Sequence, residues 1–552
     1  MGLWHQWITI SIVLLDNIGV VLRGVNPGPP RCIIGLHWAI AEPPSPPLEL
    51  AGHGLTPADV ADVARRGRRV EIAPPVRERM AESRAALDRA LAEERPVYGL
   101  TTGLGARVVE AVAPDRAAEQ SARIVRGRAA AVGEPLPAAS VRAAMLARLN
   151  GLCAGGSGAS PHVAELLAEM LNAGVHPVVP RSGSIGSGDL CLLAHVGLVV
   201  MGEGEAELGG ERLAGAEALR RAGLEPAALG PGDGLALVSS PAVAAGVAAL
   251  ALDAAEGLLE TLAIATALSM EGFRASPSPI DANVAGAHPA PGQEWEAAGL
   301  RELLRGGTLL EGRGRRLQDP LSFRCASHVH GALRWALDVL ATAVAATING
   351  AGENPLVLAS GDVVSTGNFH TPALALALDT CAIAVAQAAG PASERPARLA
   401  NERLSGLPAN LSRAGDGRSG VAPLLKTSQS LAVDIRHLAA PLAADPRFGA
   451  DGVEDDSTNA AAAALRLERQ LGLLERVVAV ELVCATLAVD LAAPERMGRG
   501  TAAAHACVRE LVEPLDDDRP LGSDVERVAR ELVASGGLRE RIREAVRWQE
   551  SS

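Results

Sequence analysis

The chain has 552 residues, of which 48% are hydrophobic and only 2% aromatic, so a large core is possible and must consist mainly of Leu, Val and Ala. Alanine- and leucine-rich sequence with few β-branched or aromatic runs favours helices, and a mainly α fold is predicted. The net charge of −13 argues against a nucleic-acid partner, which would need a basic surface. The seven cysteines are scattered without a CxxC pair, which favours reduced thiols in a cytoplasm over a disulfide framework or a structural metal site.

Residues 1–45 differ in composition from the rest of the chain. Their apolar run at 7–22 is interrupted by Asp16 and Asn17, is short for a membrane span, and lacks the basic start of a signal peptide. Proline-rich segments follow it. We expect a disordered extension, or a spurious one if the start codon is assigned too early, with a membrane anchor as the alternative. No membrane partner is expected for the remainder.

The next part of the chain predicts two helices followed by a glycine-rich loop. Thr56 is a typical N-cap for the first helix, and apolar residues at helical spacing indicate a second over 76–94. The loop reads VYGLTTGLG over 97–105 and holds Tyr98, the only tyrosine of the chain. A phenol with a pKa of about 10 is a poor base unless positive charge lies nearby. The alternative is a ring that merely packs on a loop.

The segment 178–205 is the most distinctive stretch. A helix is predicted over 162–173, with Ser160 as N-cap and Gly174 as its stop, and a second helix follows Asp189 to about residue 201. Between them lies GSIGSGDL at 183–190, too rich in glycine for a core strand. Its Ser-Gly pair therefore precedes a helix N-terminus, whose N–H groups favour a reacting group that gains electron density. An ordinary turn between helices is the alternative.

Four later strings combine polar or aromatic side chains with glycine or proline. They are GDGLALVSSP at 232–241, QDPLSFRC at 318–325, ENPLV at 353–357 and GNFHTP at 367–372. Arg324 suits a carboxylate, because a guanidinium group can donate two parallel hydrogen bonds to it, although a surface salt bridge is the alternative. Helices are also expected over 246–268, 460–491 and 508–548.

Taken in order, these strings resemble the signatures of the histidine and aromatic amino-acid ammonia-lyases. GSIGSGDL resembles the loop in which Ala-Ser-Gly cyclises to the electrophile methylidene-imidazolone (MIO), and VYGLTTGLG resembles the loop of the catalytic tyrosine. The resemblance covers about 48–548. It implies a mainly α, fumarase/aspartase-like fold with an N-terminal MIO-type domain (46–240), a central helical bundle (241–490) and C-terminal helices (491–552). It also implies a cytoplasmic homotetramer whose sites draw residues from several subunits.

The resemblance assigns a role to each candidate residue. Gly186, Ser187 and Gly188 would form MIO with no external cofactor or metal, and Tyr98 would remove the β-proton of an amino-acid substrate. Asp434 would be a further catalytic residue, as an acid/base or as a partner of the amine. The remaining candidates would bind substrate: Arg128, Ser239, Gln318, Arg324, Asn354 and Phe369. Arg128 stands where the family has the residue that recognises the side chain of the substrate. An arginine there suggests a substrate with an anionic or strongly accepting side chain, although a solvated helix end is the alternative. Asp434 also has a solvated-helix alternative.

Three departures from the family pattern leave the activity open. The loop is one residue shorter than GSxGASGDL, Ser239 stands in place of an asparagine, and Leu321 in place of a second catalytic tyrosine. The leading expectation is elimination of the α-amine through MIO, giving an α,β-unsaturated acid. The alternatives are an aminomutase, a lyase of the same fold that works without MIO, such as the ergothioneine-cleaving lyases, and a non-catalytic relative.

Overall fold

The computed structural model describes residues 46–547, except 313, 414–416, 445–448 and 450–451. The predictions for residues 1–45 fall outside the described residues. From Pro44 onward the chain clusters into one compact unit. The boundaries expected at 240 and 490 stay predictions about the organisation of that unit.

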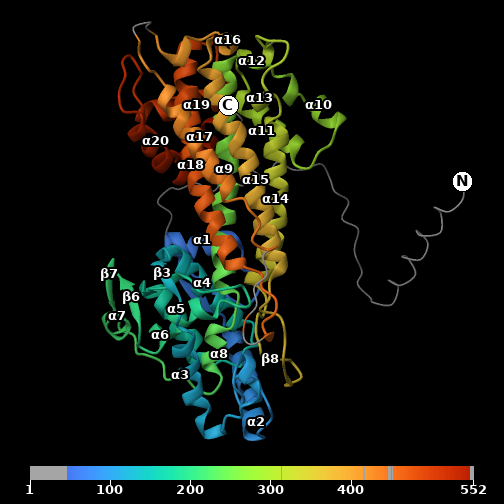
Figure 1. Cartoon of the computed structure of the whole chain (residues 1–552), viewed down its shortest axis with the longest axis vertical. Coiled ribbons are helices and arrows are strands. Elements are labelled where there is room, and N and C mark those ends of the chain that lie inside the picture. The colour runs from blue at the N-terminus through green and yellow to red at the C-terminus, as the bar shows by residue number, and fades with distance from the viewer. Residues whose placement is uncertain (1–45, 313, 414–416, 445–448, 450–451, 548–552) are drawn as a thin grey trace, which may run out of the picture. The chain divides into compact units, whose positions relative to one another are not determined.

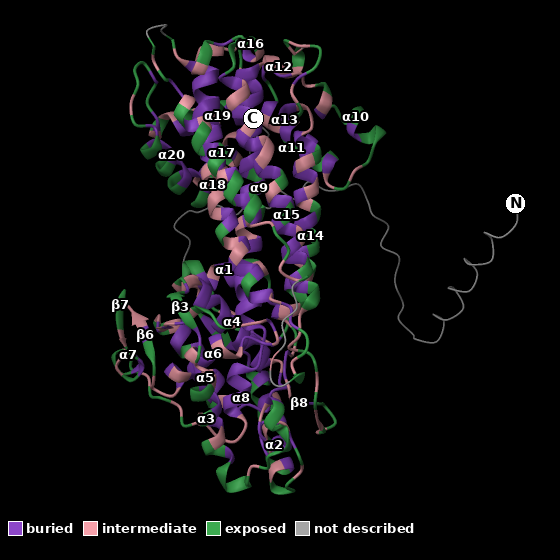
Figure 2. Ribbon diagram, in the orientation of Figure 1, coloured by how far each residue is buried: buried purple, intermediate pink, exposed green. Residues whose placement is uncertain are grey.

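The core of this unit is a bundle of long helices, as predicted (Figure 1). Its helices are α9 (Ala242–Phe273), α14 (Ala326–Ile348), α15 (Pro372–Leu399), α17 (Ala422–His437) and α18 (Ala460–Ala492). The alanine-rich α9 is buried along most of its length and packs against α18 and α4 (Figure 2). Small residues allow this approach, since a β-carbon on Gly246 would lie 2.5 Å from the backbone of Ala143. The helices predicted over 246–268 and 460–491 are thus confirmed.

Shorter helices and small sheets form the part that precedes α9. The helices are α1 (Pro57–Arg66), α2 (Pro74–Ala92), α3 (Ala117–Arg128), α4 (Ala138–Cys153), α5 (Pro161–Ala173), α6 (Leu190–Val200), α7 (Gly215–Arg221) and α8 (Asp233–Val238). Two caps agree with the sequence: Thr56 and Asp59 form a reciprocal capping box on α1, and Gly174 ends α5 at a φ of 74°. Ser160 stands at the N-cap of α5, as predicted, but its hydroxyl donates to the carboxylate of Asp233 at 2.8 Å and makes no capping bond.

The strands are short and lie outside the bundle. They are β1 (Leu48–Leu50), β2 (Val70–Ile72), β3 (Val132–Pro135), β4 (His176–Pro177), β5 (Pro180–Ser182), β6 (Glu205–Leu208), β7 (Glu211–Ala214), β8 (Leu356–Val357) and β9 (Val363–Val364). β1 and β2 are parallel, whereas β3–β5, β4–β6–β7 and β8–β9 are antiparallel. The pairing of β3 with β5, in which Val132 opposes Ser182, brings the end of α3 beside the loop at 183–189.

The remaining helices pack around the half of the bundle that contains the end of α9, some at that end and others beside the middle of α9 and α18 (Figure 1). They are α10 (Ala282–Ala287), α11 (Gln293–Leu304), α12 (Thr308–Glu311), α13 (Leu321–Arg324), α16 (Glu402–Ser405), α19 (Arg499–Leu511), α20 (Gly522–Val528) and α21 (Gly537–Arg547). The helical region predicted over 508–548 is interrupted after Leu511, where Pro514 and Pro520 cannot continue a helix.

Among the residues that the structure describes, three helical segments are long and apolar enough, by length and composition, to cross a membrane: Asp233–Phe273, Ala326–Ile348 and Pro372–Leu399. The most apolar stretch of the first, which contains α9, is wholly buried inside the fold. Core packing therefore accounts for its apolar sequence without a membrane.

Candidate active site

The loop at 183–189 forms a tight turn immediately before α6, as predicted. Gly186 and Gly188 have φ values of 88° and 77°, a left-handed conformation that favours glycine. Their backbones face each other as an isolated antiparallel bridge, so Ser187 stands at the tip of the turn.

A second loop, just before α18, holds this turn in place. The hydroxyl of Thr458 donates to the carbonyl oxygen of Gly186 at 2.9 Å, and the backbone N–H of Asn459 donates to the carbonyl of Ile185 at 2.9 Å. The hydroxyl of Ser187 donates to the backbone carbonyl of Asp456 at 3.1 Å. The loop is therefore fixed from one side by the residues that begin α18.

A third segment, which contains Phe369 and His370, also contacts the turn. His370 pairs with Ser187 as an isolated bridge, and its Nε2 lies 3.1 Å from the carboxylate Oδ2 of Asp456. Phe369 approaches the other side of the turn, since its Cβ lies 3.9 Å from where a β-carbon on Gly188 would stand.

Asp189 anchors the loop to α9, although its position in the sequence predicts a cap on α6. It stands at the N-cap of α6, as predicted, yet its side chain makes no capping bond to that helix. Instead, the carboxylate accepts hydrogen bonds from the backbone N–H of Ala244 at 2.8 Å and from the hydroxyl of Ser184 at 2.7 Å. Burial raises the pKa of Asp189 to about 6, against the effect of these hydrogen bonds. One buried carboxyl thus ties the loop to the first turn of α9.

Ser239 lies close to the same turn, after the end of α8. The backbone carbonyl of Ser240, which follows Ser239, accepts a hydrogen bond from the backbone N–H of Asp189 at 2.8 Å. Ser239 is itself buried, with 6% of its surface exposed. The structure therefore brings Phe369 and the segment that contains Ser239 to the 186–188 turn.

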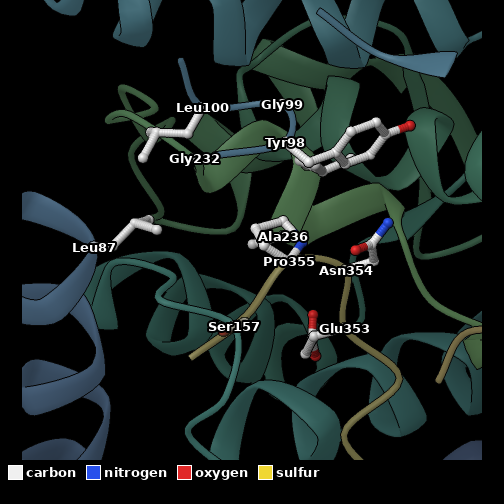
Figure 3. A pocket seen from close by; sticks show the side chains of 11 residues that line it. Leu87, Tyr98, Gly99, Leu100, Ser157, Gly232, Ala236, Glu353, Asn354 and Pro355 are labelled. Carbon is white, nitrogen blue, oxygen red and sulfur yellow. The ribbon is translucent and has the colours of Figure 1, made fainter. Parts of the chain in front are cut away.

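Tyr98 and Asn354 line one cleft together (Figure 3). The phenol oxygen of Tyr98 accepts a hydrogen bond from the backbone N–H of Gly105 at 3.0 Å. The amide oxygen of Asn354 accepts from the backbone N–H of Thr366 at 3.0 Å and from the hydroxyl of Ser365 at 3.1 Å. The other lining residues are Leu87, Gly99, Leu100, Ser157, Gly232, Leu235, Ala236, Glu353 and Pro355.

A buried ion pair fixes the Asn354 segment. Arg148 of α4 donates through both terminal nitrogens to the two carboxylate oxygens of Glu353, each at 2.9 Å, and it also donates to the carbonyl of Ala236. Both side chains are 2% exposed. Sequence reasoning missed this pair, although the two arginines inside the mainly apolar α4, Arg142 and Arg148, were an available signal.

Arg128 ends α3 on the flank of the loop. Ala131, three residues later, lies 3.0 Å from where a β-carbon on Gly183 would stand. Burial raises the pKa of the Cys191 thiol, the positive charge of Arg128 opposes this rise, and the negative charge of Glu454 adds to it. Arg128 and Glu454 therefore both lie within electrostatic reach of the start of α6.

Gln318 and Arg324 lie at the far end of the bundle. The Nη1 group of Arg324 donates to the amide oxygen of Gln318 at 3.1 Å. Next to Arg324, Phe323 stacks on Phe273, the last residue of α9, with ring centroids 4.4 Å apart. Ala244, which binds Asp189, lies in the first turn of that same helix, so the two clusters are separated by roughly 45 Å of helix. One copy of the chain does not bring Arg324 to Ser187.

Asp434 is exposed on α17, and none of the contacts described above for the 186–188 turn involves it. The acidic residue that does contact the turn is Asp456, which sequence reasoning did not select. Within the described ranges, no group of histidine, cysteine and acidic side chains is arranged to hold a metal ion.

Comparisons with known proteins agree with this architecture. The model of the family described as aromatic amino acid lyase matches residues 55–510. The chain belongs to the aromatic amino acid lyase family. A histidine ammonia-lyase of Symbiobacterium thermophilum is 41% identical over 494 residues, covering 89% of this chain and 97% of the relative.

Solved structures of the family superimpose on most of the chain. The ergothioneine-degrading enzyme of Treponema denticola matches with a TM-score of 0.85 and 30% identity, covering 89% of this chain and 99% of that structure. Tyrosine aminomutase of Streptomyces globisporus matches with a TM-score of 0.86 and 30% identity, covering 90% and 99%. The expected family and mainly helical fold are confirmed.

The family's prosthetic group, MIO, forms from three consecutive residues, and the turn at 186–188 fits its requirements. Ring closure needs the nitrogen of the third residue near the carbonyl of the first, and the bridge sets Gly188 opposite Gly186. The carbonyl to be attacked already accepts a hydrogen bond from Thr458. The first residue must be glycine here, because a β-carbon on Gly186 would lie 2.2 Å from the hydroxyl oxygen of Thr458.

Proposed function

We propose that the chain is an ammonia-lyase that removes the α-amine of histidine or a similar amino acid and releases an α,β-unsaturated acid. The observation that carries this proposal is the geometry of the 186–188 turn, a serine between two facing glycines at the start of a helix. The high identity with histidine ammonia-lyases supports the same reaction class. MIO, formed from Gly186, Ser187 and Gly188, would supply the electrophile that activates the substrate.

The roles of the surrounding residues follow from the groups they present. Tyr98, which lines the cleft with Asn354, would take the β-proton, and Asn354 would donate its amide to the substrate. Phe369 would wall the pocket beside the turn, and Ser239 would offer a hydroxyl where the family has an asparagine. The predicted role of Asp434 has no contact with the turn to support it.

The side-chain specificity of the site would depend on Arg128. A guanidinium group binds anionic or strongly accepting groups, and Arg128 lies on the flank of the loop. We therefore place histidine, with its accepting ring nitrogen, or a substrate with an acidic side chain ahead of phenylalanine.

The complete site would need more than one copy of the chain. Arg324 would bind the substrate carboxylate and Gln318 would support it, but both lie one α9 length away from Ser187. A homotetramer would bring the α13 end of one copy to the 186–188 turn of another. Exposed apolar side chains on the bundle, such as Trp335, Leu376 and Ile383, are consistent with such burial. The thiols in the described part of the chain form no disulfide, in keeping with a cytoplasmic enzyme.

A second candidate is amine elimination without MIO. It is favoured by the short loop, by Leu321 in place of the second tyrosine, and by the match to an ergothioneine-degrading enzyme. A quaternary amine is already a good leaving group and would not need the electrophile. An aminomutase would use the same turn and differ in its product, and a non-catalytic relative would show no turnover.

Intact mass and turnover of the purified chain distinguish these functions. We expect a mass lower by two waters, release of ammonia and an ultraviolet-absorbing acid, and loss of both the mass change and turnover in Ser187→Ala. An unmodified mass in an active enzyme would establish the MIO-independent reaction instead. Formation of a β-amino acid would indicate an aminomutase. Turnover that survives both Tyr98→Phe and Arg324→Ala would contradict the proposed site.

A further inference from the structure

Asp456 contacts the 186–188 turn through its backbone and is itself fixed through its side chain. Its backbone carbonyl accepts the hydroxyl of Ser187 at 3.1 Å. Its carboxylate Oδ1 accepts the backbone N–H of Ser457 at 2.8 Å, and Oδ2 lies 3.1 Å from Nε2 of His370. Nε2 donates this bond, because a carboxylate accepts. His370 therefore contacts the side chain of the residue whose carbonyl accepts the Ser187 hydroxyl.

His370 also contacts the serine directly. The two residues form an isolated antiparallel bridge, in which directly opposed residues have β-carbons about 5 Å apart. Three contacts thus join Ser187, Asp456 and His370 in a closed cycle. The cycle joins three segments that are far apart in the sequence.

The contribution of this cycle to stability is expected to be small. The side chain of Asp456 is 70% exposed and that of His370 is 25% exposed. Ion pairs and hydrogen bonds this exposed add little to the free energy of unfolding. The pair instead involves the residue whose backbone carbonyl accepts the Ser187 hydroxyl.

We propose that His370, acting through Asp456, positions the hydroxyl of Ser187 for cyclisation of the loop. This inference rests on the proposed function, because it concerns formation of the family's prosthetic group. His370 is a positioning residue, since it acts on the hydroxyl through Asp456. A serine free to rotate about χ1 occupies three staggered rotamers, and the bond to the Asp456 carbonyl selects one of them.

The chemistry served by this positioning is a double dehydration. The nitrogen of Gly188 bonds to the carbonyl carbon of Gly186, and the carbonyl oxygen leaves as water with the N–H protons of Gly188 and Ser187. The Cβ–Oγ bond of Ser187 then breaks, and its hydroxyl leaves as a second water with the proton from Cα. No atom outside the chain is consumed, and no external oxidant or reductant is needed.

The test follows conversion of the loop by mass rather than by activity. The full chain is made by cell-free translation, and intact mass is recorded over time for the wild type, His370→Leu, His370→Gln and Asp456→Ala. We expect loss of the two waters to be about tenfold slower in His370→Leu and Asp456→Ala. His370→Gln should convert within about twofold of wild type, because its amide N–H can occupy the place of Nε2. The double variant should be no slower than either single one.

A matched control removes another histidine–aspartate pair, which lies away from the 186–188 turn. His505 binds Asp490 through Nε2 at 2.7 Å, with both side chains 24% exposed, near the opposite end of α18. His505→Leu should convert at the wild-type rate. The inference is overturned if His370→Leu converts as fast as wild type, or if His370→Gln is as slow as His370→Leu, which would mean that the imidazole itself transfers a proton. If the wild-type loop never loses water, the proposed function fails and the inference fails with it.

Discussion

The hydroxyl of Thr458 donates to the carbonyl oxygen of Gly186 at 2.9 Å, and the same hydroxyl oxygen lies 2.2 Å from where a β-carbon on Gly186 would stand. The bond that fixes the proposed ring-forming carbonyl therefore also excludes a side chain at the first position of the turn. At this position, where GSxGASGDL has alanine, the shorter loop therefore has no room for a side chain.

Gly186→Ala should damage the turn more than left-handed strain alone predicts. Gly210 is the matched control, because its φ is 83° against 88° for Gly186 and no atom lies within 4 Å of its ideal β-carbon. We expect Gly210→Ala to lower the free energy of unfolding by about 1 kcal/mol and Gly186→Ala by about 3 kcal/mol, with loss of the mass change. Denaturant unfolding measures both, and equal midpoints for the two variants would contradict the steric argument.

Asp189 should make stability depend on pH between about 4 and 6. Its folded-state pKa is raised to about 6 by burial, above the ordinary value of about 3.9. The folded state therefore binds the proton more tightly, so this contribution is fully present below about pH 4 and is lost as the pH rises through about 6. The difference corresponds to about 3 kcal/mol.

Asp189→Asn isolates this contribution, because the amide keeps an acceptor for Ala244 and has no charge to bury. Other buried carboxyls, such as Glu271, titrate in both proteins and cancel in the comparison. We expect the variant to be more stable than wild type by up to about 3 kcal/mol at pH 7, with the advantage disappearing near pH 4. Urea unfolding at a series of pH values measures it, and parallel pH profiles would refute the assignment.

Removing Glu353 should be costly, because Arg148 would remain charged and 2% exposed without its partner. We expect Glu353→Ala to lower the free energy of unfolding by about 3–5 kcal/mol. Glu165→Ala is the control, since its partner Arg77 is half exposed, and it should cost less than about 1 kcal/mol. Similar costs for the two variants would show that the buried pair is not needed to fix the Asn354 segment.

Arg128→Met should change substrate preference rather than general activity. If the guanidinium group reads an accepting side chain, kcat/KM should fall about tenfold for histidine and change little for phenylalanine. Arg126→Met is a close control, because Arg126 is exposed and paired with Glu203 at 2.6 Å. An equal fall in kcat/KM for both substrates, or the same effect from Arg126→Met, would show that another residue recognises the substrate side chain.

The sequence was sufficient for features that depend on neighbouring residues. The turn before α6, the caps at Thr56 and Gly174, and the long α9 all follow from local patterns. Contacts between distant segments did not follow. His370 and Asp456 lie 86 residues apart, and no spacing links them.

The choice between acidic residues shows the same limit. Asp434 and Asp456 both lie in the part of the chain that precedes α18, and only bundle packing decides that the start of α18 meets the turn. The motif that contains Arg324 was visible, but its separation from Ser187 was not, because the fold places the two at opposite ends of α9. The local patterns therefore predicted the parts of the site, and packing decides which parts meet.

The separation of Arg324 from Ser187 predicts complementation between two inactive variants. Ser187→Ala should remove the electrophile and Arg324→Ala the carboxylate clamp, so each homotetramer should have almost no activity. When both are co-expressed in equal amounts, about a quarter of the sites should combine an intact turn from one copy with an intact arginine from another. Activity should then recover to about a quarter of wild type.

The control for this experiment pairs Ser187→Ala with Gly188→Ala. Both residues belong to the same turn, so no mixed assembly can contain a site with both intact, and activity should stay absent. Native mass spectrometry confirms that mixed tetramers form in each case. Mixed tetramers of Ser187→Ala and Arg324→Ala that remain inactive would refute a shared site, because a site contained in one copy cannot be rescued by another.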